Sequence, residues 1–118
     1  MQILKSASVR TSLLVCTALT FMHSPGSAQD AQAGLGLARE HCARCHAITA
    51  SDESIHKSAP PFREVVTRYP PSNLIEALVE GIATGHPDMP EFEFTPVQAS
   101  DLIAHLETLL PSDTRNAD

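Results

Sequence analysis

Apolar residues recur every three or four positions in three stretches of the chain, a spacing that places them on one face of a helix. The stretches cover residues 31–45, 72–85 and 95–110. The last stretch opens with a capping box, since Thr95 precedes a proline at the first helical position and Gln98 follows three residues after the cap. No segment alternates apolar and polar residues as a half-buried strand does. The pattern therefore predicts an all-α domain.

The segments between these helices are polar or rich in proline. Residues 47–59 are polar and weakly periodic, which predicts a loop. Paired prolines on either side limit residues 62–69 to about two helical turns. Ser72 is the candidate N-cap of the second firm helix and Gly85 is its expected end. The apolar residues expected to form stripes on the last two firm helices are Leu74, Ile75, Leu78, Val79, Ile82, Val97, Leu102, Ile103, Leu106 and Leu110.

The beginning of the chain has the features of a secretory signal peptide. Two basic residues precede the apolar run TSLLVCTALTFM, and the small residues Gly26 and Ala28 occupy the two positions that a signal peptidase reads. The run is shorter than the about 20 residues that cross a bilayer, although an uncleaved membrane anchor is the alternative. The expected organisation is a removed signal at residues 1–28, one domain at 29–111 and a polar tail at 112–118.

Removal of the signal leaves 90 residues, in which six Lys and Arg face fourteen Asp and Glu, a net charge near −8. An acidic surface argues against nucleic acid, whose phosphates require basic residues, and favours a basic protein partner. Alternatively, the charge only keeps the protein soluble. A domain of this size has a thin core and usually needs a cofactor, a metal or disulfides. A disulfide between Cys42 and Cys45 would close too short a loop to supply that stability.

These two cysteines stand with a histidine as C-x-x-C-H, at Cys42, Cys45 and His46. Residues three apart on a helical turn share one face, so both thiols can reach the two vinyl groups of one porphyrin. His46 then lies under the iron as an axial ligand. This spacing is the signature of c-type haem attachment, and it predicts one covalently attached haem c. His41 and Arg44, which complete the hexapeptide HCARCH, are expected to be surface side chains.

Three other sites could use the same cysteines. A redox-active dithiol needs its C-x-x-C at a helix N-terminus after a strand, whereas this pair lies at the end of a helix. A structural zinc site needs two further ligands, and His41 and His46 flank the thiols too tightly to close a tetrahedron easily. A plain disulfide is the third alternative.

Met89 is the single methionine left after removal of residues 1–28, and it is the candidate for the second axial ligand. Pro87 and Pro90 limit the freedom of its loop, so the loop can hold a thioether at a fixed distance from a metal. Core methionines usually belong to helical stripes, and Met89 does not. His86 is the rival ligand on the same loop. A His/Met pair raises the reduction potential of a haem iron.

From residue 29 onward the chain resembles a small class I c-type cytochrome almost end to end. The resemblance rests on the C-x-x-C-H motif, the proline turn APPF, a methionine followed by proline and an amphipathic last helix. It implies the all-α cytochrome c fold, in which three main helices and one short helix pack around a covalently bound haem. It also implies that the Pro60 carbonyl accepts a hydrogen bond from His46 Nδ1. Phe62 is then expected to pack on the haem.

The resemblance further places Gly36 where the first and last helices cross, against the stripe that carries Ile103 and Leu106. One departure lies in the last helix, where the usual aromatic residue is absent and His105 stands in that neighbourhood, so we expect a looser crossing. A buried haem propionate needs hydrogen-bond donors. The candidates are Tyr69, Arg63 and Arg68.

The function implied is that of a periplasmic electron carrier whose iron has both axial positions filled, so no enzymatic activity is expected. The ring of lysines by which mitochondrial cytochromes dock is absent, and we expect redox protein partners that dock through a basic surface. A membrane would be contacted only indirectly, through a respiratory complex. One alternative is a dedicated haem c subunit of a periplasmic dehydrogenase or oxidase complex. The other is a haem sensor with a labile sixth ligand.

Overall fold

A computed structural model of the chain describes residues 29–83 and 85–114. The predicted signal peptide and the last residues of the predicted polar tail lie outside this part. The elements in order are α1 (Ala31–His41), α2 (Phe62–Arg68), the 3-10 helix η1 (Pro71–Leu74), α3 (Ile75–Glu80) and α4 (Pro96–Thr108). The described residues contain no strand, which confirms the prediction of an all-α fold. None of these helices is both long and apolar enough to cross a membrane.

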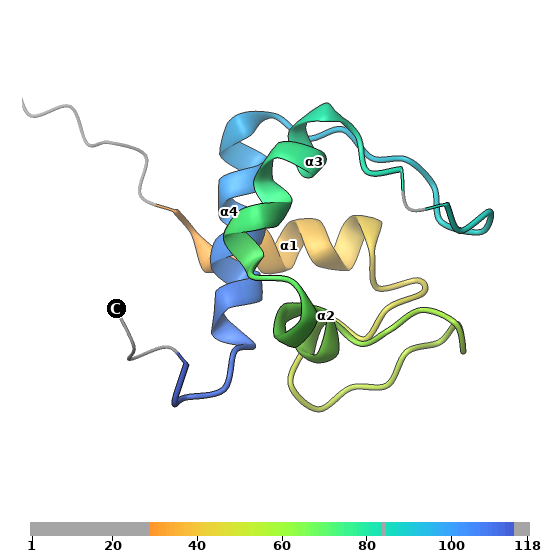
Figure 1. The fold of residues 1–118 in the computed structure, drawn as a ribbon, viewed down its shortest axis with the longest axis horizontal. Coiled ribbons are helices and arrows are strands. Elements are labelled where there is room, and N and C mark those ends of the chain that lie inside the picture. Colours follow the sequence, from red (N-terminus) through yellow and green to blue (C-terminus); the bar gives the residue numbers. More distant parts are fainter. Residues whose placement is uncertain (1–28, 84, 115–118) are drawn as a thin grey trace, which may run out of the picture.

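The architecture depends on α1 and α4, which pack against each other, while α3 and α2 complete the remaining sides (Figure 1). Asp30 caps α1, since its carboxylate accepts hydrogen bonds from the amides of Gln32 and Ala33. Thr95 and Gln98 form the predicted capping box at the start of α4. Both caps satisfy amide groups that a helix N-terminus leaves without partners. The buried apolar core consists of Ala38, Ile48, Val66, Leu78, Phe94, Ala99, Leu102, Ile103 and Leu106.

The crossing of α1 and α4 occurs at Gly34, not at Gly36 as predicted. Gly34 is buried, and a Cβ atom there would overlap the carbonyl oxygen of Asp101 and lie 3.0 Å from the Cβ of His105. Gly36 is exposed, and a Cβ there would meet no atom within 4 Å. The reason is helical geometry, because Gly34 shares a face with the fully buried Ala38, whereas Gly36 points to the opposite side.

The stripe predicted on α4 is correct at its centre and wrong at its beginning. Leu102, Ile103 and Leu106 are buried, whereas Val97 is 53% exposed. Val97 lies two positions before the buried Ala99, which places it on the opposite face of the helix. The fold therefore uses only the part of α4 that faces α1 and α3 for its core.

The second firm helix is shorter and less regular than predicted. It begins as the 3-10 helix η1, where no side chain caps the N-terminus, and Ser72 is not the cap. It ends at Gly81, whose φ of 101° terminates it four residues before Gly85. Beyond that point, the Ile82 amide donates to the carbonyl of Phe92 (3.4 Å), and the Phe94 amide donates to the carbonyl of Leu78 (2.9 Å). These tertiary hydrogen bonds replace the expected last helical turn. Ile75 lies partly outside the predicted stripe, at 36% exposure.

The loop at residues 47–59 has no regular structure, as predicted, but side chains fasten it. The carboxylate of Asp52 accepts hydrogen bonds from the amides of Ile48 (2.9 Å) and Thr49 (2.8 Å). The Arg63 guanidinium donates to the Asp52 carbonyl at 2.8 Å. The hydroxyl of Ser54 accepts from the amide of Ala47 at 2.9 Å. These bonds give the buried backbone the partners that regular structure would otherwise supply.

His105 joins this loop to α4. Its side chain is 5% exposed, and its Nε2 donates to the carbonyl oxygen of Ile48 at 2.8 Å. A buried imidazole with a specific hydrogen bond therefore stands where the resemblance suggested a loosened helix crossing. Because the helices still meet closely at Gly34, the expectation of looser packing is wrong.

The crossing at Gly34 predicts opposite effects for two matched alanine variants of α1. Gly34→Ala should lower the free energy of unfolding by about 2–3 kcal/mol, because the new methyl group overlaps backbone that cannot move without separating the helices. Gly36→Ala should raise it by about 0.5–1 kcal/mol, because alanine favours the helix and the site is open. Denaturant unfolding of both variants measures the difference. Equal effects of the two changes would contradict the observed crossing.

Asp52 predicts a pH-dependent contribution to stability. Burial raises the pKa of its carboxyl, but hydrogen bonds from Ile48 and Thr49 outweigh burial and hold the pKa below its ordinary value. A depressed pKa in the folded state stabilises the fold above the pKa of the unfolded chain, and this contribution is lost as pH falls through the folded value. Asp52→Asn should therefore cost about 1 kcal/mol at neutral pH and less in acid.

Unfolding by denaturant at neutral pH and near pH 3 tests this expectation. The exposed neighbour Glu53 provides the control, since Glu53→Gln removes one carboxylate from the same loop without removing those hydrogen bonds. A stability difference between Asp52→Asn and the unchanged protein that stays constant across this pH range would show that the carboxylate is not the stabilising group.

Candidate functional site

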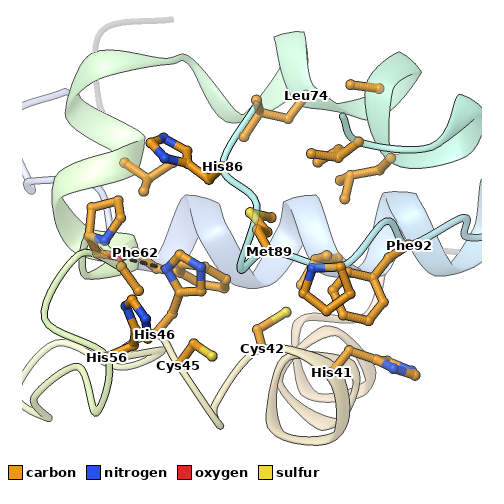
Figure 2. Close-up of a pocket in the computed structure, with 18 of the residues that line it drawn as sticks. His41, Cys42, Cys45, His46, His56, Phe62, Leu74, His86, Met89 and Phe92 are labelled. Atoms are coloured by element: carbon orange, nitrogen blue, oxygen red, sulfur yellow. Dashed lines mark hydrogen bonds between the residues drawn. The ribbon is translucent and has the colours of Figure 1, made fainter. Parts of the chain in front are cut away.

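One cavity of about 690 Å³ lies between the end of α1, helices α2 to α4 and the loop that follows α3. Figure 2 shows Cys42, Cys45 and His46 on one side of it and Met89 on the loop opposite. Its apolar wall includes Leu74, Leu78, Ile82, Leu102 and Leu106. Seven of the residues predicted for the site line this cavity, namely Cys42, Cys45, His46, Pro60, Phe62, Tyr69 and Met89.

The two cysteines lie in a tight turn directly after α1. The predicted helix over residues 31–45 ends at His41, and Cys42 is its C-cap. The amides of Cys45 (3.0 Å) and His46 (2.9 Å) then donate to the carbonyl oxygen of Cys42. This turn keeps both thiols and the imidazole at one edge of the cavity. The helix therefore positions the motif but does not contain it.

Both thiols are free and half-buried, so the structure contains no disulfide between them. Burial raises the pKa of the Cys42 thiol to about 11. A reactive dithiol needs the opposite, a lowered pKa that favours the thiolate. A thioether carries no charge, so burial of the sulfur does not disfavour it. Within residues 29–83 and 85–114, no group of three His, Cys, Asp or Glu residues is arranged to hold a metal ion.

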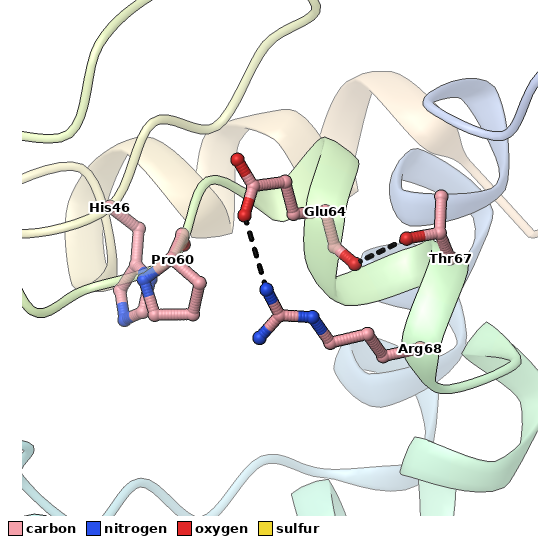
Figure 3. A network of polar contacts seen from close by, with 5 residues as sticks. All are labelled: His46, Pro60, Glu64, Thr67 and Arg68. Carbon is pink, nitrogen blue, oxygen red and sulfur yellow. Dashed lines mark hydrogen bonds and ion pairs between the residues drawn. The ribbon is translucent and has the colours of Figure 1, made fainter.

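His46 has a fixed orientation. Its Nδ1 donates to the carbonyl oxygen of Pro60 at 2.8 Å, as predicted, and Figure 3 shows the two residues next to each other. The ring of Phe62 lies against it, with centroids 5.2 Å apart and an interplanar angle of 40°. The Phe62 amide donates to the Ala47 carbonyl at 2.8 Å, which anchors the proline turn to the chain just after the motif. Because Nδ1 is the donor, Nε2 carries the lone pair that can bind a metal.

Met89 and His86 both line the cavity, so the structure brings both candidate ligands to it. The Met89 amide donates to the His86 carbonyl at 3.1 Å, which closes a turn between the two residues. Met89 is half-buried, whereas both its neighbours and His86 are exposed. Of residues 85–90, the methionine is therefore the least exposed.

The three candidate propionate donors are not equivalent. Arg68 and Tyr69 line the cavity, and Tyr69 is 58% exposed. Arg68 also pairs with Glu64 at 3.3 Å within α2 (Figure 3). Arg63 is not among the lining residues, because its guanidinium donates to the carbonyl of Asp52 instead. Arg63 thus supports the loop at residues 47–59.

His41 is a lining residue that the sequence interpretation missed. It was expected at the surface, yet its side chain is 31% exposed and its ring contacts those of both Phe92 and Phe94. Helical spacing could have predicted this position, because residues 34, 38 and 41 of α1 share one face of the helix. Arg44 is exposed, as expected, and lies at the cavity mouth. His56 also lines the cavity, and its Nε2 lies 3.6 Å from the carboxylate of Asp88.

The residues of this cavity fit a haem. Two thiols three positions apart are suited to covalent attachment, and an imidazole with its Nδ1 already bonded offers Nε2 to iron. The apolar wall suits the porphyrin, while the rim offers polar groups for its propionates. These features together favour haem over a dithiol or a zinc site.

Comparison with known proteins agrees with this assignment. The chain is 32% identical over 99 residues to a protein named cytochrome c-552 from Bradyrhizobium diazoefficiens, and the match covers 82% of this chain and 93% of that relative. No family model matches the chain, and no solved structure matches it. A relative this similar over most of both chains implies a covalently bound haem c, with which Cys42 and Cys45 are compatible. The chain therefore belongs to the c-type cytochromes and is an electron carrier.

Proposed function

We propose that this cytochrome works in the periplasm as a mobile electron carrier, with one haem attached through Cys42 and Cys45 and with His46 and Met89 as axial ligands. The observation that carries the proposal is the convergence of these four side chains on one apolar cavity. The apolar run before residue 29 supports export.

The side chains of the cavity have separate roles in this proposal. When bound, the haem supplies one-electron chemistry. Cys42 and Cys45 hold it covalently, so it cannot dissociate in a dilute compartment. His46 offers Nε2, and the hydrogen bond from its Nδ1 to the Pro60 carbonyl fixes the ring and increases its basicity as a ligand. Phe62 limits rotation of the same ring.

Met89 is the proposed ligand on the opposite side of the site. A thioether is a weak donor that favours the reduced metal and raises the reduction potential. The apolar wall would shield the bound haem from water on this side. With both axial positions filled, the chain's residues serve binding, orientation and burial rather than substrate chemistry. Arg68 and Tyr69 at the rim are the proposed propionate donors.

The proposed partner is a redox protein with a basic surface, which the net charge near −8 of residues 29–118 attracts at long range. Among the described carboxylates, Asp88 alone lines the cavity, where Arg44 and Arg68 also lie. The acidic charge therefore acts during approach, and the contact at the mouth itself is nearly neutral. Salt should slow electron exchange with such a partner by screening this attraction, and faster exchange at higher salt would contradict the proposal.

The visible spectrum and mass of the protein purified from the periplasm test the attachment. We expect a reduced c-type spectrum and a mass of residues 29–118 plus one haem, with the haem retained in denaturant. Cys42→Ala with Cys45→Ala should abolish this retention, because no thioether can form. A double variant that still holds haem in denaturant would refute the attachment, and a mass that includes residues 1–28 would refute cleavage.

Carbon monoxide binding tests the axial ligands. The reduced protein should not bind carbon monoxide rapidly, whereas Met89→Ala should bind about one molecule per haem, because the change opens one coordination position. His86→Ala is the matched control on the same loop, and its reduced haem should not bind carbon monoxide rapidly. If His86→Ala binds carbon monoxide rapidly and Met89→Ala does not, His86 is the ligand instead.

A further inference from the structure

The loop that carries Met89 has few restraints of its own near the methionine. Outside residue 84 it is described throughout, and it contains no helix or strand between Gly81 and Thr95. The Met89 amide donates to the nearby His86 carbonyl, within the same turn. Among the described residues, backbone hydrogen bonds join this loop to the rest of the fold at Phe92 and Phe94, which pair with Ile82 and Leu78. The position of Met89 therefore depends on how firmly residues 92–94 are held.

His41 holds these residues from the side of α1. Its ring centroid lies 5.6 Å from that of Phe92, with an interplanar angle of 59°, and 5.4 Å from that of Phe94, with an edge-on angle of 76°. Phe92 and Phe94 are stacked at 6.2 Å. Edge-on and tilted contacts at these distances are the favourable geometries for aromatic rings. Phe94 is 6% exposed and belongs to the core, so the cluster is anchored.

We propose that His41 is a positioning residue for Met89. It contacts Phe92, three residues after the methionine, and it directly precedes Cys42. One side chain thus links the turn that carries the cysteines to the loop that carries the methionine, and it sets the separation of the two sides of the cavity. This inference rests on the proposed ligation by Met89.

A second contact on the other side of Met89 provides a comparison. His56 approaches the carboxylate of Asp88, the residue before the methionine, at 3.6 Å. The side chains of His56 and Asp88 are 41% and 79% exposed, so solvent screens their interaction. The ring of His41 is less exposed and contacts two anchored aromatic rings. His41 is therefore the stronger restraint on the loop.

The test uses the ferric haem protein with four substitutions. The charge-transfer band between a thioether and ferric iron reports occupancy by Met89, and hydrogen exchange of the hydrogen-bonded amides of Met89 and Phe94 reports the loop directly. His41→Ala should lose more than half of the band and exchange these amides at least tenfold faster. His41→Phe should restore both, because a phenyl ring keeps the aromatic contacts while removing the ring nitrogens. His56→Ala should lose a smaller part of the band than His41→Ala does.

Val66→Ala is the control for general destabilisation. Val66 is 3% exposed, belongs to the core and does not line the cavity. This variant should be less stable and keep the full band. An unchanged band and unchanged exchange in His41→Ala, a failure of His41→Phe to restore them, or an equal loss in Val66→Ala would each overturn the proposal, as would a larger loss in His56→Ala.

The wild-type protein separates the two proposals. If its ferric spectrum lacks the band, ligation by Met89 is wrong, and amide exchange alone decides the role of His41. If the band is present and His41→Ala retains it, with slow exchange of the Met89 and Phe94 amides, only the positioning role is wrong.

Discussion

The contact between α1 and α4 is the constraint on which the rest of the structure depends. Gly34 allows the two helix backbones to meet, because any side chain at that position would overlap the carbonyl of Asp101. The same face of α1 continues through Ala38 to His41 and ends at the cysteine turn. On α4, His105 follows Asp101 by one helical turn and reaches the loop after the motif through Ile48. The close approach of two backbones thus fixes where the two cysteines, His46 and their supporting loop begin.

The cavity itself is built mainly from irregular segments, and their backbone groups must find partners outside helices. On the His46 side they do so repeatedly. Asp52, Ser54 and Arg63 bond to loop backbone, and the Pro60 carbonyl accepts from His46. Single bonds of this kind contribute about 1 kcal/mol each, but leaving a buried group without its partner costs more. The polar composition of residues 47–59, which in the sequence only indicates a loop, is therefore what allows this loop to be ordered.

Local patterns in the sequence were sufficient for the fold class, the capping box at Thr95, the haem motif and the hydrogen bond from His46 to Pro60. Each of these depends on neighbouring residues or on a spacing shared with a known family. The sequence was not sufficient for the crossing glycine, because Gly34 and Gly36 differ only in the face of α1 that meets α4. The end of α3 at Gly81 was missed for a similar reason, since hydrogen bonds to Phe92 and Phe94 compete with the last helical turn. His41 looked like a polar surface residue, and His105 was expected only to stand in place of an aromatic residue. Tertiary packing alone gives both of them buried partners.

The two sides of the cavity are held in physically different ways, and this difference bears on electron transfer. His46 is fixed by a hydrogen bond, by Phe62 and by a turn that continues from α1. Met89 is held by a turn with His86 and, at a distance of three residues, by aromatic contacts. Oriented hydrogen bonds tolerate less displacement than ring contacts do. A change in the environment of the protein would therefore alter the methionine side before the histidine side. If Met89 ligates the iron, the part of the structure that tunes the reduction potential is also the part that can move most easily.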